Sequence, residues 1–211
     1  MRNICVLTFV SMDGVMQGPG APEEDTSGGF RHGGWTVGYF DAFVGEEMNK
    51  EMGHPFDLLL GRRTYDIFAS HWPKVTEPGA DLGINKASKY VATNQPLSTN
   101  WNGTATRLEG DIVEAVRKLK AGSGPELQVH GSSTLIQTLL ENDLVDELWL
   151  KTSRSRSEAG AGCSLPEHSM QVSPWSRAAP HRAASSSLST GELATSSLGP
   201  SRCRREVSRV A

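Results

Sequence analysis

Up to Lys151, short runs of apolar and β-branched residues alternate with segments whose apolar residues recur at helical spacing. This alternation is typical of βα units, in which helices join successive parallel strands and cover the sheet. It predicts one α/β domain of three layers: a mixed, mainly parallel sheet with helices on both faces. The runs expected to form strands are Ile4–Val10, Phe56–Leu60, Lys89–Thr93, Leu127–His130 and Leu144–Leu150.

The segments between these runs predict helices. Asp111–Ala121 is the clearest, because its apolar residues share one face and Gly122 follows directly. Further helices are expected within Trp35–Met52 and after the turns Gly61-Arg62-Arg63-Thr64 and Gly131-Ser132-Ser133.

Composition and charge exclude several classes of protein. The chain of 211 residues contains 37% hydrophobic residues but no run of about 18 apolar residues, so no membrane-spanning helix is expected. Its start reads as a first strand rather than a signal peptide. Three cysteines without a CxxC pair and six histidines without ligand spacing predict neither disulfides nor a metal site. Residues 1–151 contain 13 Lys and Arg against 20 Asp and Glu, and this acidic body argues against nonspecific nucleic-acid binding. A cytoplasmic protein is therefore expected.

Three polar, glycine-bearing turns follow expected strands, at the edge where an open α/β sheet binds ligands. Gly61-Arg62-Arg63-Thr64 starts a helix, whose N-terminus attracts phosphate, and the two arginines add donors. Gly131-Ser132-Ser133 also starts a helix, and its glycine lets the backbone approach a pyrophosphate closely. Thr93-Asn94 could hydrogen-bond an adenosine ribose or its phosphate. Each turn also has a purely structural explanation: a helix start, a helix cap and an ordinary turn.

Two further possibilities concern catalysis. Asp13, in the turn Ser11-Met12-Asp13-Gly14, could handle a proton or anchor a substrate, although turn chemistry alone favours a simple Asp-Gly turn. A hydrolase that uses Ser132 or Ser133 has little support, because Gly131-Ser132-Ser133 is not a Gly-x-Ser-x-Gly elbow.

In this order and spacing, the motifs resemble the dihydrofolate-reductase-like superfamily, specifically the C-terminal reductase domain of bacterial riboflavin-biosynthesis deaminase-reductases. The resemblance covers residues 1–151. It implies a dihydrofolate-reductase-like fold and hydride transfer from NADPH to a small pterin-like or ribosylaminopyrimidine-like substrate, as in a 5-amino-6-(5-phosphoribosylamino)uracil reductase. The stretches that carry it are Ser11–Gly14 with Gly18–Gly20, Leu58–Asp66, Val91–Asn94 and Val129–Leu140 with Val145–Leu148.

The resemblance also implies roles for individual residues. It assigns the Gly61 turn, through Arg62, Arg63 and Thr64, to the NADPH phosphates, and Thr93 and Asn94 to the adenosine 2′-phosphate side. It assigns Gly131, Ser132 and Ser133 to the pyrophosphate, and it places Asp13 near the substrate as the catalytic residue.

The sequence also departs from the family. The zinc signature of the deaminase half is absent, so the chain would be a stand-alone reductase. Nothing distinguishes Asp41 as the buried acid of dihydrofolate reductases, which disfavours dihydrofolate as substrate. The alternative function is a nucleotide-binding protein without turnover, and a homodimer is possible.

After Lys151 the composition changes abruptly. Residues 152–211 contain 15 serines and eight arginines but no Lys, Ile, Phe, Tyr, Asp or Asn, which predicts a disordered, low-complexity tail. Shifting the reading frame just after Lys151 permits Phe-Pro-Leu-Thr-Leu-Gly-Ser-Gly-Arg-Arg-Leu-Phe, which resembles the strand and glycine turn of the family. We therefore expect a frame-shifted C-terminus in which the terminal strands are lost, the sheet edge is unpaired and activity is weak or absent.

Overall fold

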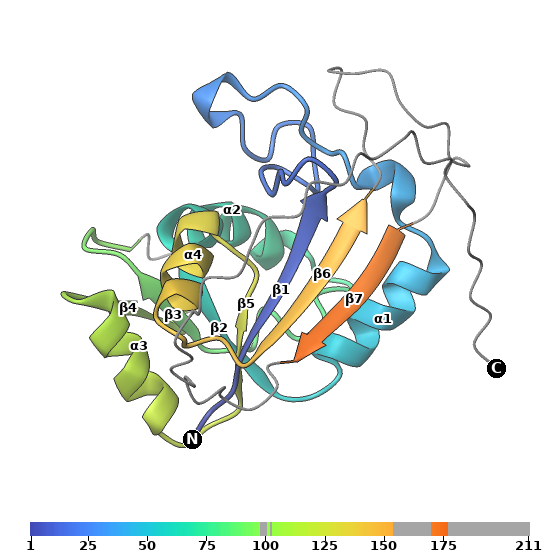
Figure 1. Cartoon of the computed structure of the whole chain (residues 1–211). Coiled ribbons are helices and arrows are strands. Elements are labelled where there is room, and N and C mark those ends of the chain that lie inside the picture. Colours follow the sequence, from blue (N-terminus) through green and yellow to red (C-terminus); the bar gives the residue numbers. More distant parts are fainter. Residues whose placement is uncertain (98–100, 102, 154–169, 177–211) are drawn as a thin grey trace, which may run out of the picture. The chain divides into compact units, whose positions relative to one another are not determined.

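The computed structural model describes residues 1–97, 101, 103–153 and 170–176 (Figure 1). Within them, seven strands form one sheet in the order β4-β3-β2-β5-β1-β6-β7, in which only β7 is antiparallel to its neighbour. The predicted mixed, mainly parallel sheet is confirmed. The strands are β1 (Ile4–Ser11), β2 (Phe56–Gly61), β3 (Lys89–Ala92), β4 (Ala105–Leu108), β5 (Glu126–Val129), β6 (Glu147–Ser153) and β7 (Met170–Ser176). The α-helices are α1 (Ala42–Met52), α2 (Arg62–His71), α3 (Ile112–Ala121) and α4 (Ser133–Glu141).

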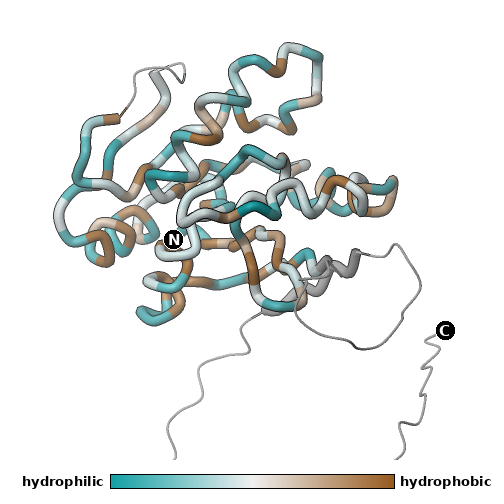
Figure 2. Tube along the Cα trace, turned by 90° about the horizontal axis from the view of Figure 1, so that it is seen from above, coloured by the Kyte–Doolittle hydropathy of each residue, from teal (hydrophilic) through white to brown (hydrophobic). Residues whose placement is uncertain are grey.

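Successive residues of the central strands contribute to two different cores, because side chains alternate between the faces of a sheet. Leu59 of β2 lies in a core with residues of α3 and α4. Leu58 and Leu60 lie in a second core with residues of α1 and α2. The predicted three-layer arrangement is therefore confirmed. Figure 2 shows hydrophobic and hydrophilic residues alternating along the helices, as expected for elements with one buried face. In the part of the chain described, no helix is long and apolar enough to cross a membrane.

Two elements differ from the sequence-based predictions. The helix expected within Trp35–Met52 begins only at Ala42, because Asp41 caps it: the extended Asp41 accepts a hydrogen bond from the Val44 amide at 2.9 Å. Strand β4 was not predicted, since it is a four-residue edge strand with no fully buried residue. Asp41 therefore has a structural role as a helix cap.

The edge of the sheet beyond β6 also differs from the prediction of an unpaired edge. β7 pairs antiparallel with β6, from Glu147 opposite Ser176 to Ser153 opposite Met170. A proline at position 174 is compatible with this place, because an edge strand tolerates a residue without an amide hydrogen. The other residues after 153 lie outside the described part of the chain, so the disordered tail and the frame shift stay predictions.

Candidate functional site

A cavity of about 1380 Å³ lies at the carboxyl ends of β1, β2 and β5. One end of it is polar and is lined by the first residues of α2 and by the residues that join β5 to α4. The other end is apolar and includes Met48, Met52, Phe68 and Trp72, which belong to or pack against one hydrophobic cluster. The glycine-rich segment after β1 lines a third side. The predicted turns Arg62-Arg63-Thr64 and Gly131-Ser132-Ser133 thus come together at one cavity.

The junction between β5 and α4 lines the cavity with backbone groups and carries no charged side chain. Ser132 is the N-cap of α4, but its side chain forms no capping hydrogen bond, so the first amides of the helix have no partner from that hydroxyl. Gly131 has a φ of +153°, in the region that favours glycine, and an added Cβ would lie 2.7 Å from Oγ1 of Thr64. The Gly131–Ser132 peptide bond is cis. Glycine at 131 is therefore required by both conformation and space.

The β2–α2 junction packs directly against this one. The amide of Gly61 donates a hydrogen bond to the Gly131 carbonyl at 3.1 Å. A Cβ on Gly61 would overlap the hydroxyl of Ser132. Gly61 therefore positions the two helix starts against each other, while Arg62 and Thr64 beyond it line the cavity.

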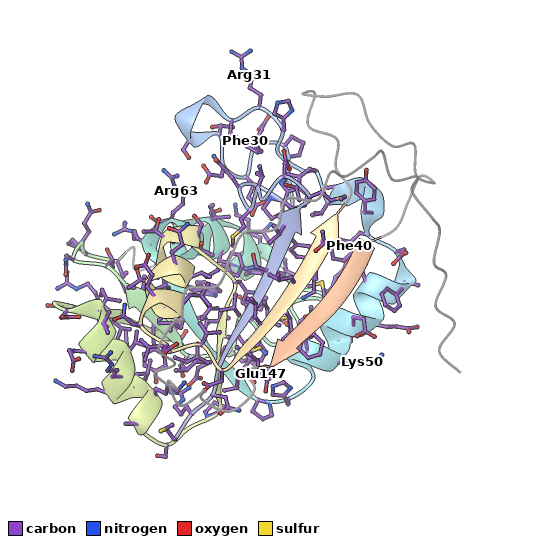
Figure 3. All side chains as sticks on the ribbon, in the orientation of Figure 1. Phe30, Arg31, Phe40, Lys50, Arg63 and Glu147 are labelled. Carbon is purple, nitrogen blue, oxygen red and sulfur yellow. The ribbon has the colours of Figure 1, made fainter. Side chains whose placement is uncertain are left out.

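Both arginines at the start of α2 already have partners. Arg62 donates from Nε to Oδ2 of Asp66 at 2.7 Å and from Nη1 to the Pro96 carbonyl at 2.6 Å. Arg63 is 59% exposed and donates from Nη1 to the Ser27 hydroxyl at 2.5 Å. Figure 3 shows Arg63 at the top of α2, on the same upper side as the loop with Phe30 and Arg31. An incoming phosphate would therefore compete with Ser27 for Arg63.

Asp25 lies beside the same guanidinium group, 3.6 Å from Nη1 of Arg63. Burial raises the pKa of this carboxyl, but hydrogen bonds from Ser27 together with the charge of Arg63 outweigh it, so the net pKa is lowered. Asp25 is thus ionised at neutral pH and helps to hold Arg63 against the loop.

The glycine-rich loop keeps its shape through hydrogen bonds that cross it. Nε1 of Trp35 donates to the Gln17 carbonyl at 2.9 Å, and the Thr36 hydroxyl donates to the Pro19 carbonyl at 2.6 Å. The amide of Gly34 donates to the carbonyl of Gly18 at 2.7 Å. The loop therefore forms a defined wall of the cavity.

Thr93 and Asn94 do not line the cavity. The Thr93 hydroxyl accepts a hydrogen bond from the Gln95 amide at 3.1 Å, and Oδ1 of Asn94 accepts one from the Gly110 amide at 3.3 Å. Their turn still lies beside the start of α2, because Arg62 binds the carbonyl of Pro96. A position next to the polar end of the cavity is thus compatible with the role that the resemblance implies.

Asp13 lies on an exposed turn outside the cavity lining. It accepts a hydrogen bond from the Ser11 hydroxyl, which in turn accepts one from the Val15 amide at 2.9 Å. These bonds tighten the turn at the end of β1. Its catalytic role stays a prediction.

Sequence reasoning missed His130, which lines the cavity directly before Gly131. The His130 ring packs against Phe68, with ring centroids 6.0 Å apart. Its Nε2 atom is buried and has no hydrogen-bond partner among the described residues. Burial and the positive charge of Lys151 lower the pKa of His130 to about 3, so the imidazole is neutral. No histidine spacing in the sequence signals this position.

The Lys151 charge that acts on His130 belongs to a buried ion pair between Lys151 of β6 and Glu51 of α1, with 3% and 4% of the side chains exposed. Burial raises the pKa of Glu51, and the charge and hydrogen bond of Lys151 lower it only in part. Gln128 of β5 donates from Nε2 to the Glu51 carbonyl at 2.9 Å. The interface between α1 and the sheet therefore holds a polar cluster that the sequence pattern did not reveal.

Comparison with known proteins identifies the family to which the chain is similar. The model of the RibD C-terminal domain matches residues 2–152. The uncharacterized protein YyaP of Bacillus subtilis (strain 168) is 28% identical over 97 residues, 44% of this chain and 50% of the relative. The chain thus spans about half the length of this curated relative.

Two solved structures are also similar. A putative riboflavin biosynthesis protein from Shewanella sp. PV-4 superposes with a TM-score of 0.53 and 22% identity, over 74% of this chain and 78% of that one. Dihydrofolate reductase from Enterococcus faecalis, complexed with NADP(H) and RAB-propyl, gives a TM-score of 0.45 and 14% identity, over 79% of this chain and 78% of that one. The first likeness agrees with the predicted fold.

Proposed function

The chain belongs to the RibD C-terminal domain family, which supports a function of reductase type, and from this premise we propose that it is an NADPH-dependent reductase. Its substrate would be a small pterin-like or ribosylaminopyrimidine-like molecule, reduced at a carbonyl or imine carbon. This is the reaction that the resemblance to riboflavin reductases implies.

The convergence of two helix N-termini at one cavity carries this proposal. Neither α2 nor α4 has a side-chain cap, so amides at both starts are left to bind an anion. The α4 start, with its close glycine backbone, would bind the pyrophosphate. Arg62 and Arg63 at the α2 start would bind the 2′-phosphate through charge-assisted hydrogen bonds. NADPH, when bound, supplies the hydride.

The apolar end of the cavity suits the rest of the reaction. Met48, Met52, Phe68 and Trp72 give apolar walls against which a heterocycle would pack. Such walls exclude water from the reacting carbon and hold the substrate ring in place. Asp13 remains our candidate for the group that handles the proton, through a movement of its turn toward the cavity.

The experiment has two readouts on the same protein. NADPH binding is measured by quenching of tryptophan fluorescence, for which Trp72 is a reporter because it lines the cavity. Turnover is measured as loss of reduced nicotinamide absorbance with 5-amino-6-(5-phosphoribosylamino)uracil and with dihydrofolate. We expect binding, turnover of the uracil compound and no turnover of dihydrofolate. Failure to bind NADPH would refute the proposal.

The second candidate is a nucleotide-binding protein without turnover. The position of Asp13 outside the cavity lining favours it, because Asp13 is the one catalytic residue that we predicted. NADPH binding without turnover of either compound would support this alternative.

A further inference from the structure

His130 adjoins one residue of each end of the cavity. The next residue, Gly131, belongs to the polar end, and the ring of Phe68 belongs to the apolar end. If the dinucleotide occupies the polar end, its reactive ring and the substrate ring meet beside this imidazole. His130 is thus placed to contact the substrate rather than the cofactor phosphates.

Only one ring nitrogen of His130 is both buried and unpaired among the described residues. Nε2 is buried and, among the residues described, has no hydrogen-bond partner. A buried N–H without an acceptor costs free energy and is rare in folded proteins. Burial and the charge of Lys151 keep the imidazole neutral, so one of its nitrogens carries a lone pair instead of a proton. The ring proton should therefore be on Nδ1.

We propose that His130 is a specificity-determining residue that uses Nδ1–H to donate a hydrogen bond to a carbonyl oxygen or ring nitrogen of a flat heterocyclic substrate. The proposal rests on the proposed function only in taking the apolar end as the substrate site. It requires that the substrate carry a hydrogen-bond acceptor on the edge that faces β5.

The role of His130 follows from its charge as well as its place. Because the imidazole is neutral, we assign it the role of a hydrogen-bond donor that positions the substrate. A hydrocarbon ring of the same shape would fill the space but leave the donor unpaired. Discrimination by an unpaired polar group is stronger than discrimination by shape alone.

The tautomer is tested first, on the wild-type protein without any ligand. A long-range ¹H–¹⁵N spectrum of protein labelled with ¹⁵N-histidine reports which ring nitrogen carries the proton, and the His130→Asn variant assigns the signal. We expect a neutral ring protonated at Nδ1. A ring protonated at Nε2, or doubly protonated at neutral pH, would overturn the proposal.

The donor is tested next with pterin as the probe, titrated by its own fluorescence. An asparagine amide group can occupy the place of Nδ1, whereas a glutamine amide group reaches the place of Nε2. We expect pterin affinity close to wild type in His130→Asn and roughly three- to tenfold weaker in His130→Gln, the range for one neutral hydrogen bond. His54→Gln is the matched control, because His54 is exposed and lies outside the cavity lining.

Equal affinity in the Asn and Gln variants, or no pterin binding by the wild type, would contradict the assignment. Neither measurement needs NADPH, so failure of the His130 proposal can be told apart from failure of the reductase proposal. A protein that binds no NADPH but keeps the Nδ1 tautomer and the Asn–Gln contrast would refute the reductase and leave the heterocycle site standing.

Discussion

The two strand–helix junctions at the cavity both begin with a glycine but offer ligands different chemistry. The β5–α4 junction, Gly131-Ser132-Ser133, contains no charged residue. Its backbone at Gly131 packs so closely against Thr64 that an added Cβ would collide with the Thr64 hydroxyl. The β2–α2 junction carries Arg62 and Arg63, whose guanidinium groups already bind protein atoms.

This difference separates substitutions that change the stability of the fold from substitutions that change the affinity for the cofactor. At Gly131 of the β5–α4 junction the structure leaves no space for a side chain, so a substitution there should lower the stability of the folded protein. At the β2–α2 junction the arginines are half-buried or exposed, so substitutions should change cofactor affinity and leave the fold intact. The predictions below test that separation, from the largest expected effect to the smallest.

Gly131→Ala should lower the free energy of unfolding by about 2–4 kcal/mol. The alanine must adopt a backbone conformation that favours glycine, and its Cβ would collide with the Thr64 hydroxyl. Urea unfolding measures the effect. Gly45→Ala in α1 is the control, because nothing lies within 4 Å of its added Cβ, and it should be neutral or stabilising. Equal stability of Gly131→Ala and the wild type would show that the junction is not closely packed.

The double variant Arg62→Ala, Arg63→Ala should abolish a preference for NADPH over NADH of about 1.5–3 kcal/mol, the scale for hydrogen bonds to charged groups. Dissociation constants for both cofactors, measured by fluorescence quenching, check this. Arg117→Ala on α3 is the matched control, since that arginine is exposed and pairs with Glu114. A preference that survives the double variant would remove these arginines from the 2′-phosphate site.

Gly61→Ala should destabilise the protein by about 1–2 kcal/mol, less than Gly131→Ala, because the Ser132 hydroxyl in its way can rotate and the φ at Gly61 is ordinary. Combining it with Ser132→Gly should recover part of the loss. A double-mutant cycle measured by urea unfolding reports this coupling. Strictly additive effects would mean that the two junctions do not contact each other.

Ser27→Ala should tighten NADPH binding two- to threefold, because it removes a partner that competes for Arg63; an exposed hydrogen bond of about 0.5 kcal/mol sets this scale. The same fluorescence titration measures it, with Ser70→Ala on α2 as the control. Weaker binding in Ser27→Ala would indicate that Ser27 orients Arg63 for the cofactor instead of withholding it.

Sequence patterns predicted the parallel core because its strands are continuous apolar runs and its helices have one apolar face. They failed where local signals were weak or overruled. The four residues of β4 carry little apolar pattern. The apolar residues between Trp35 and Asp41 form only a short 3₁₀ helix, Val37–Tyr39, because the α-helix begins after its cap at Asp41.

The site was predictable only in part. Turns with glycine and arginine after strands indicated the polar end of the cavity, because that chemistry is local in sequence. His130 was not predictable, since its neutrality and its buried nitrogen depend on Lys151 and Phe68, which are distant in sequence. The contact of Gly61 with Gly131 likewise exists only once β2 and β5 pair.

The most direct test of the NADPH site is an NMR titration of the ¹⁵N-labelled chain with NADPH. Backbone amides that bind the cofactor phosphates must change their chemical shifts. We predict the largest changes at Ser132, Ser133 and Thr134 of α4 and at Arg63 and Thr64 of α2, with small changes in α3. Saturable binding that leaves the α2 and α4 amides unchanged would contradict the account.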